Sequence, residues 1–159
     1  MGAKGEALAK QFEAKAAEAT AVLEKLSDAD WKKVTEAEKW SVGVTAHHVA
    51  SSHEGIANII KAVVGGQSMG NFSMDMLHQM NAQHAKEHAN CTKADTIALH
   101  KKGAATAASV VRGLSDDQLT KSGTVLTGMP AMTAEQVVTN ILINHINDHF
   151  GSIKKTVGA

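Results

Sequence analysis

The sequence predicts an all-α protein, and three observations carry this prediction. The chain of 159 residues contains a single proline. Alanine is abundant, and apolar residues recur with the 3.6-residue period of an α-helix. No segment alternates apolar and polar residues as a half-buried strand does. Because 43% of the residues are hydrophobic, the chain can bury one sizeable core, and we expect a single domain over residues 1–159.

Two long helices are expected in the first half of the chain. Apolar residues at helical spacing predict a helix over residues 4–26, which the following segment SDADW ends. A second helix is expected over residues 41–64, where the Gly-Gly pair that follows supplies a C-terminal cap. Residues 65–71 are then expected to form a loop.

The second half is expected to hold two further helical regions. The third covers residues 73–111, with a break near Thr92, because Thr92 and Asp95 have the spacing of a capping box. The segment TAEQ repeats this kind of signature at Thr133 and opens a last helix over residues 133–155. Four long helices with short caps favour a bundle.

The nine histidines outnumber the three Phe, two Trp and no Tyr of the chain and need an explanation. In the last helix, His145 and His149 project at the centre of the apolar stripe, one turn apart. A buried imidazole nitrogen without a partner costs about 1–3 kcal/mol, so something polar must meet them. The His-x-x-x-His spacing lets two ring nitrogens bind one metal ion. Two hydrogen-bonded core histidines are an equally good interpretation of this pair alone. The stripe consists of Val138, Ile141, Leu142 and Ile153.

The second helix supplies a third candidate ligand. On a helical wheel His48 lies on the flank of the apolar stripe and can reach the interior of a bundle, whereas His47 and Glu54 project away from it. His53 lies on the other flank and is expected at the boundary of the core. Three inward imidazoles, His48, His145 and His149, would leave coordination positions open, as in catalytic rather than structural metal sites.

The third helical region carries a second His-x-x-x-His pair, His84 and His88. Both share one face with Asn81 and are expected to point inward with it. We interpret the three residues as pocket wall or as hydrogen-bond partners of the ligands, and His84 and His88 as alternative ligands remain open. His78 and His100 are expected at the surface. The remaining members of this face are Met74, Leu77 and Met80.

Composition and motifs argue against several functions. Lys plus Arg and Asp plus Glu number 16 each, and no basic stripe carries interleaved aromatic residues, which argues against nucleic-acid binding. No apolar run is long enough for a membrane span, and a single cysteine, Cys91, fits a reducing compartment, so a cytoplasmic protein is expected. A di-iron carboxylate bundle needs Glu-x-x-His pairs, and the chain has none. Neither a phosphate-binding loop nor a nucleophile elbow is present.

The order and spacing of several short motifs resemble the DinB superfamily, also called DinB/YfiT-like. These motifs are the Trp40-Ser41 pair with His48 after it, the His145 and His149 pair, the Asn81-Ala82 dipeptide and the segment LSDDQL. The resemblance implies a four-helix bundle with one long crossover, frequently a homodimer. It also implies that His48, His145 and His149 bind zinc, nickel or iron. The chain departs from many relatives in having Val44 where an acidic residue often precedes this histidine by four positions, and in its doubled His47-His48.

Relatives in this superfamily include S-transferases and isomerases that use low-molecular-weight thiols, such as bacillithiol S-transferases and mycothiol-dependent maleylpyruvate isomerase. We therefore expect a metal-dependent transfer or isomerisation between such a thiol and a small electrophile. His84 or His88 would carry the proton, and Asn81 would contact the bound molecule. Two alternatives remain open. One is a non-catalytic binding module, since Glu54 and Asp148 project away from the site, and the other is a metal-assisted hydrolase.

Overall fold

The computed structural model describes residues 2–68 and 70–159, and within them the predicted all-α bundle is confirmed. Met69, in the loop predicted over residues 65–71, lies outside the described residues. Three bundle helices are α1 (Ala3–Lys25), α3 (Val42–Val64) and α5 (Lys93–Arg112), and the fourth is a continuous run of α7 (Ala134–Gln136), η1 (Val137–Ile143) and α8 (Asn144–Val157). The minor elements are α2 (Asp28–Lys32), α4 (Met74–Glu87), α6 (Asp116–Leu119) and an antiparallel pair, β1 (Ser122–Gly123) with β2 (Met132–Thr133).

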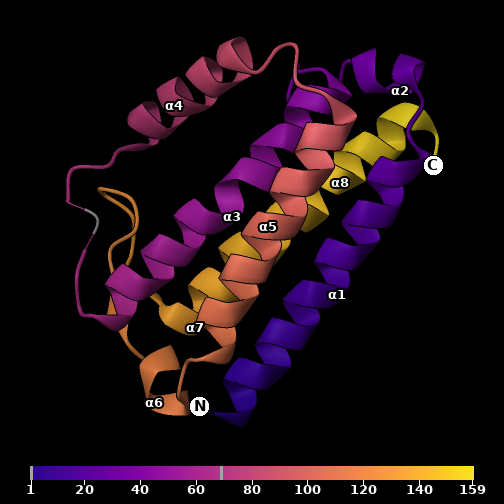
Figure 1. The fold of residues 1–159 in the computed structure, drawn as a ribbon. Coiled ribbons are helices and arrows are strands. Elements are labelled where there is room, and N and C mark those ends of the chain that lie inside the picture. Colours follow the sequence, from indigo (N-terminus) through magenta and orange to yellow (C-terminus); the bar gives the residue numbers. More distant parts are fainter. Residues whose placement is uncertain (1, 69) are drawn as a thin grey trace.

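The helices do not follow one another around the bundle in chain order. Helix α5 packs against α1 and α3, and α8 packs against the same two helices, so α1 and α3 occupy diagonal positions (Figure 1). The longest connection between bundle helices, residues 65–92, carries α4 along the outside of α3. This connection is the long crossover that the sequence analysis expects. It leaves α4 outside the four bundle helices.

Polar caps fix where the helices begin. Ser27, Ser115 and Thr133 each form a reciprocal capping box with the residue three positions later. Ser41, Ser73 and Thr92 each accept a hydrogen bond from a backbone N–H of the first helical turn. Such caps satisfy N–H groups that have no partner within the helix. The predicted starts of the long helices are therefore confirmed to within one residue, with Thr92 marking the break between α4 and α5.

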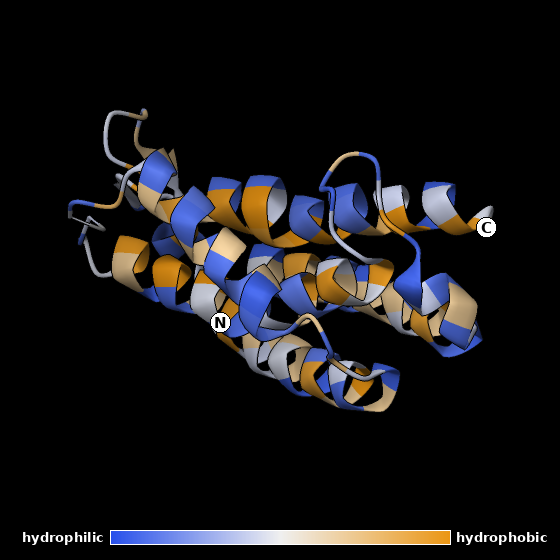
Figure 2. Cartoon of the chain, turned by 90° about the horizontal axis from the view of Figure 1, so that it is seen from above, coloured by the Kyte–Doolittle hydropathy of each residue, from blue (hydrophilic) through white to orange (hydrophobic). Residues whose placement is uncertain are grey.

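The core lies between the four bundle helices. Apolar and polar residues alternate along each of them in bands, as expected for amphipathic helices (Figure 2). Gly103 of α5 lets this helix approach α3 closely, since a Cβ there would lie 3.1 Å from the carbonyl oxygen of Ala50. This close packing brings two histidines, His53 and His100, into the core. The largest side chains that the core encloses completely include Phe12, Leu23, Ile60, Leu142 and Ile153.

A π-helical segment, η1, interrupts the last helix just before the two histidines. The expected uniform α-helical stripe is therefore wrong in detail, because a π turn shifts the phase of the residues that follow it. Ile141, expected in the buried stripe, is only half-buried. Beyond η1 the fully buried residues are Ile146, Phe150 and Ile153. His145 and His149 thus lie at the edge of the buried stripe, not at its centre, and face the site described next.

Candidate metal centre

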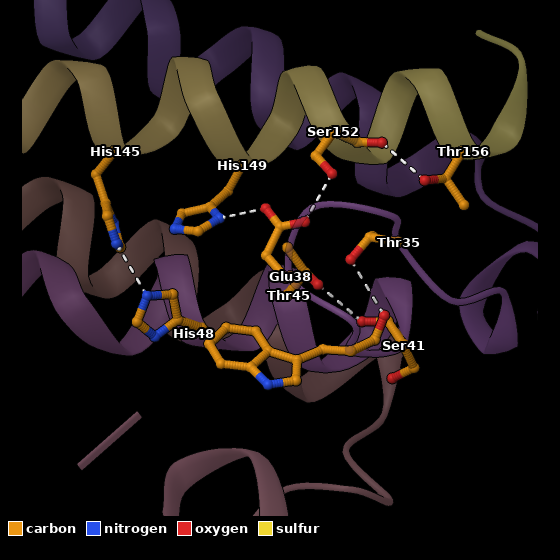
Figure 3. A network of polar contacts seen from close by, with 10 residues as sticks. Thr35, Glu38, Ser41, Thr45, His48, His145, His149, Ser152 and Thr156 are labelled. Atoms are coloured by element: carbon orange, nitrogen blue, oxygen red, sulfur yellow. Dashed lines mark hydrogen bonds and ion pairs between the residues drawn. The ribbon is translucent and has the colours of Figure 1, made fainter. Parts of the chain in front are cut away.

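The structure brings His48, His145 and His149 together. His48 comes from α3 and the other two from α8, and the candidate ligand nitrogens of the three rings all lie within 4.8 Å of one another. Nε2 of His48 and Nε2 of His145 are 2.9 Å apart (Figure 3). Two nitrogens bound to one tetrahedral zinc ion, each at about 2.0–2.1 Å, are roughly 3.3 Å apart. Small side-chain adjustments would therefore let these nitrogens share an ion.

Glu38 holds the third imidazole in place. Nδ1 of His149 donates a hydrogen bond to Oε2 of Glu38 at 2.6 Å, and the hydroxyl of Ser152 donates to Oε1 at 2.6 Å (Figure 3). The proton on Nδ1 leaves Nε2 of His149 with a free lone pair, which is the form a metal ion needs. Carboxylates that orient a ligating imidazole in this way are a regular feature of metal sites.

The loop before α3 explains how Glu38 reaches α8. A bridge between Val34 and Ser41 closes this loop, and Lys39 turns the chain with a φ of 64°. The side chain of Glu38 is only 9% exposed. Helical periodicity does not predict this residue, because it says nothing about a loop position. The available signal was an acidic side chain two residues before the Trp40-Ser41 pair.

The electrostatics of the site favour neutral imidazoles and an ionised carboxylate. Burial, together with the neighbouring histidines, lowers the pKa of both His48 and His145 to about 3. Burial opposes ionisation of Glu38, but hydrogen bonds from Ser152, His149 and Thr35 outweigh it and lower the pKa of this carboxyl group. His48 and His145 are thus unprotonated at neutral pH, as metal ligands must be.

The donor set fits a divalent transition-metal ion. Three imidazoles, one of them oriented by a carboxylate, suit zinc, nickel or iron and leave further coordination positions free. The acidic group beside the site comes from Glu38 and not from α3, where Val44 is buried four residues before His48. Within residues 2–68 and 70–159, the buried Nδ1 of His145 has no hydrogen-bond partner.

A pocket of about 600 Å³ adjoins His48 and His145. Its walls come from α3, α4, η1 and the loop at Val125, and they are mainly apolar. Asn81 and His84 are half-buried and line this pocket, as the sequence analysis expects. The apolar residues of the wall include Ile56, Ile59, Leu77, Leu126 and Ile141.

His47 is buried, whereas the helical wheel of α3 predicts that it projects away from the bundle. Although expected to face away from the bundle, it is only 9% exposed. Its Nδ1 lies 2.8 Å from Nε2 of His84, and its ring stacks on that of His88 with centroids 4.1 Å apart. The expectation was wrong because α4 covers the outer side of α3, which a wheel of α3 alone cannot reveal.

His53 and His100 correct two further expectations. His53 was expected at the boundary and His100 at the surface, but they are 0% and 1% exposed. Nε2 of His100 donates to the carbonyl oxygen of Ala16 at 2.9 Å, so its Nδ1 accepts from Nε2 of His53 at 3.0 Å. The close approach of α5 to α3 at Gly103 buries the pair. His78 is exposed, as expected.

The side chains of α4 are less buried than the sequence predicts. It has no fully buried residue. Asn81, His84 and His88 are half-buried, while Met80 is 57% exposed and Met74 is also exposed. Met80, Asn81 and His84 line the pocket, whereas Met74 and His88 do not. The expected inward face is therefore only partly correct, because α4 packs on one side of α3 rather than inside the bundle.

The sequence matches the mycothiol maleylpyruvate isomerase N-terminal domain over residues 12–142, which is most of the chain. The chain belongs to this family. Since this family is part of the DinB-like superfamily, the resemblance stated above is confirmed. No curated protein matches the sequence significantly.

Solved structures show the same fold. YfiT from Bacillus subtilis, a probable metal-dependent hydrolase with an unusual four-helix bundle topology, superposes with a TM-score of 0.77 at 15% identity, covering 99% of this chain and 90% of YfiT. The mycothiol-dependent maleylpyruvate isomerase superposes with a TM-score of 0.74 at 13% identity. A mutant of that isomerase gives the same TM-score at 12% identity.

The match to the isomerase covers 94% of this chain but 60% of that protein, so the chain spans about three fifths of its length. At these identities the likeness shows the fold alone. Among the described residues, no helix has the length and apolar character needed to cross a membrane.

Proposed function

We propose that this chain binds a divalent metal ion, zinc, nickel or iron, through His48, His145 and His149. We propose further that the site promotes the reaction of a low-molecular-weight thiol with a small electrophile, as an S-transfer or an isomerisation. One observation carries the proposal. Three imidazoles, with one oriented by Glu38, converge at the edge of a mainly apolar pocket of about 600 Å³.

The chain offers no thiol of its own for this chemistry. Cys91, the single cysteine, does not line the pocket, and burial raises the pKa of its thiol. It is therefore protonated at neutral pH and a poor nucleophile. An external thiol is needed, which supports a cosubstrate of this kind.

Each residue of the site has a separate role in the proposal. His48, His145 and His149 donate nitrogen lone pairs, and Glu38 keeps the proton of His149 on Nδ1. A divalent ion, when bound, supplies the Lewis acidity that lowers the pKa of a thiol or of water. The apolar wall, including Ile59 of α3, excludes water from the electrophile.

Polar residues of the pocket would handle the substrate. The thiolate sulfur forms a bond to an electrophilic carbon of the substrate, and the electron pair displaced from that carbon takes up a proton. His84 lines the pocket and would carry this proton, with His88 next to it at a ring-centroid distance of 4.6 Å. The amide of Asn81 would hydrogen-bond a polar group of the bound molecule. In an isomerisation the thiol would be eliminated again after rotation about the carbon–carbon bond.

A metal-assisted hydrolase is the second candidate, favoured by the likeness to YfiT. It would use the same three ligands with water in place of the thiol. A non-catalytic metal-binding bundle remains the alternative if neither reaction occurs.

An activity assay with and without thiol separates these functions. Metal-loaded protein is mixed with a fluorogenic electrophile such as monochlorobimane and a panel of small thiols, and His145→Ala is the matched variant. We expect conjugation that needs both thiol and metal and is lost in His145→Ala. Turnover of esters without thiol would instead support the hydrolase. If metal-loaded protein accelerates neither reaction above buffer, the enzymatic proposal is wrong.

The family likeness also supports a small-molecule substrate, a homodimer and a cytoplasmic location, without nucleic-acid or membrane partners. The equal numbers of acidic and basic residues support the absence of a nucleic-acid partner. Sedimentation equilibrium at micromolar concentration tests the dimer. A single species of monomer mass would contradict it.

A further inference from the structure

A second group of three histidines lies between α3 and α4, next to the first triad. His47 of α3 and His84 and His88 of α4 have candidate ligand nitrogens that all lie within 4.8 Å of one another. This group shares no residue with the first triad. The neighbours His47 and His48 point in different directions because successive side chains on a helix are rotated by about 100°. One therefore faces α4 and the other faces α8.

The geometry of this second group resembles that of the first. Nδ1 of His47 lies 2.8 Å from Nε2 of His84, which is close to the 2.9 Å between the nearest nitrogens of the first triad. The ring of His88 stacks on His47, with an interplanar angle of 22°. The hydroxyl of Ser51, one turn after His47, lies 3.3 Å from the same nitrogen of His84. Three imidazoles and one hydroxyl thus surround a small volume.

Packing alone gives little reason for these residues to meet. Helix α4 has no fully buried residue, and its principal contact is with α3. Hydrophobic burial therefore contributes little to its docking, and such elements open locally at low cost. Nδ1 of His84 is nevertheless buried and has no hydrogen-bond partner among the residues that the structure describes. A bond from each of His84 and His88 to one ion would hold α4 in place where apolar contacts do not.

We infer that His47, His84 and His88 form a second site for a divalent transition-metal ion, which fastens α4 to α3. The ligand set is nitrogen only, so the site selects ions that accept imidazole, such as Zn²⁺, Ni²⁺ or Cu²⁺, over Mg²⁺ or Ca²⁺. This second site does not depend on metal binding by the first triad. It would replace the proton-carrying role proposed above for His84 and His88, because a nitrogen that binds the ion cannot also carry the proton.

The second site would control the pocket. Leu77, Met80 and Asn81 of α4 form part of the pocket wall, and His84 belongs to both the wall and the second site. The rings of His84 and His48 are 5.7 Å apart, so the two sites are neighbours. Fastening α4 therefore orders one wall of the pocket beside the first triad.

Two measurements test the inference on the full chain. Equilibrium dialysis of untagged, metal-stripped protein against excess Zn²⁺, followed by mass-spectrometric metal analysis, counts ions per chain. Hydrogen–deuterium exchange then follows the amides of residues 74–87 with and without Zn²⁺. The test variant is His88→Gln. The matched control is His78→Gln, because His78 is an exposed histidine on the same helix.

We expect two ions in the wild type and in His78→Gln, and one in His88→Gln and in His149→Ala. Zn²⁺ should slow exchange across residues 74–87 in the wild type but not in His88→Gln. The inference is wrong if His88→Gln binds as many ions as the wild type, or if Zn²⁺ leaves exchange in α4 unchanged. It is also wrong if a single ion is lost from both His88→Gln and His149→Ala, since the two groups would then share it.

Discussion

The first triad and the His53–His100 pair are both built from buried imidazoles on helices. They differ in the groups that their ring nitrogens contact. In the pair, His100 donates to the carbonyl oxygen of Ala16 and accepts from His53, so that both ring nitrogens of His100 have partners within the core. In the triad, three rings converge beside a pocket, and an ionised carboxylate fixes the tautomer of one ring. Burial is common to both groups, so it does not distinguish a ligand set from a structural pair. A ligand set is distinguished by nitrogen lone pairs that converge next to a pocket.

The largest expected effect separates the two groups by metal affinity. In a His88→Gln background, which leaves the first triad as the proposed zinc site, removing a ligand, as in His149→Ala, should weaken zinc binding by more than about 100-fold, because even the loss of an orienting partner costs about 10–100-fold. His100→Asn should leave this affinity unchanged. Competition with a chromophoric chelator measures both variants. Equal losses of zinc affinity in the two variants would contradict the assignment of one group as ligands and of the other as a structural pair.

The role of the carboxylate gives the next effect. Glu38→Gln removes the charge that holds His149 and should weaken zinc binding by about 10–100-fold. Glu36→Gln is the matched control, since this neighbouring carboxylate is exposed and pairs with Lys155 at the surface. The same competition titration applies. A wild-type affinity in Glu38→Gln would mean that His149 is oriented by its packing alone.

A substitution in the His53–His100 pair should lower the stability of the protein rather than its metal affinity. His100→Leu leaves the carbonyl of Ala16 and Nε2 of His53 without partners in the core, at a cost of about 1–3 kcal/mol in the free energy of unfolding. Urea unfolding in the presence of a chelator measures this cost. Unchanged stability in His100→Leu would show that the buried pair contributes nothing to the fold.

The pH dependence of the metal-free protein gives the last effect, which is a change in the slope of stability against pH. Burial lowers the pKa of His53 to about 3 from its ordinary 6.5. The contribution of His53 to stability is therefore complete above pH 6.5, and it falls as the pH drops toward 3, because the unfolded chain takes up a proton that the folded chain refuses. His53→Leu should flatten the slope below pH 6.5 by up to about 1.4 kcal/mol per pH unit. Parallel curves for the two proteins would contradict the assignment.

Local patterns explain how much of this could be predicted from the sequence. Apolar periodicity and capping residues at Ser41, Thr92 and Thr133 were sufficient for the bundle, because caps and amphipathic faces are properties of single helices. The spacing of His145 and His149 is likewise local. His48 was identified because it lies on the flank of an apolar stripe.

The remaining features depend on contacts between segments far apart in the chain. His47 is covered by α4, the partner of His53 lies 47 positions away, and Glu38 reaches His149 from a loop 111 positions earlier. No periodicity within one helix contains this information. The phase shift at η1 was equally invisible, since a π turn follows from how the helix packs rather than from a residue signature.

The most direct test of the central claim is a zinc competition titration of the metal-stripped protein with a chromophoric chelator. His88→Gln, which lacks a ligand of the second site, should take up one equivalent of zinc ahead of the chelator, and the double variant His88→Gln/His149→Ala should not. Uptake by the double variant equal to that of His88→Gln, or no uptake by the wild type, would contradict the assignment of His48, His145 and His149 as a metal site.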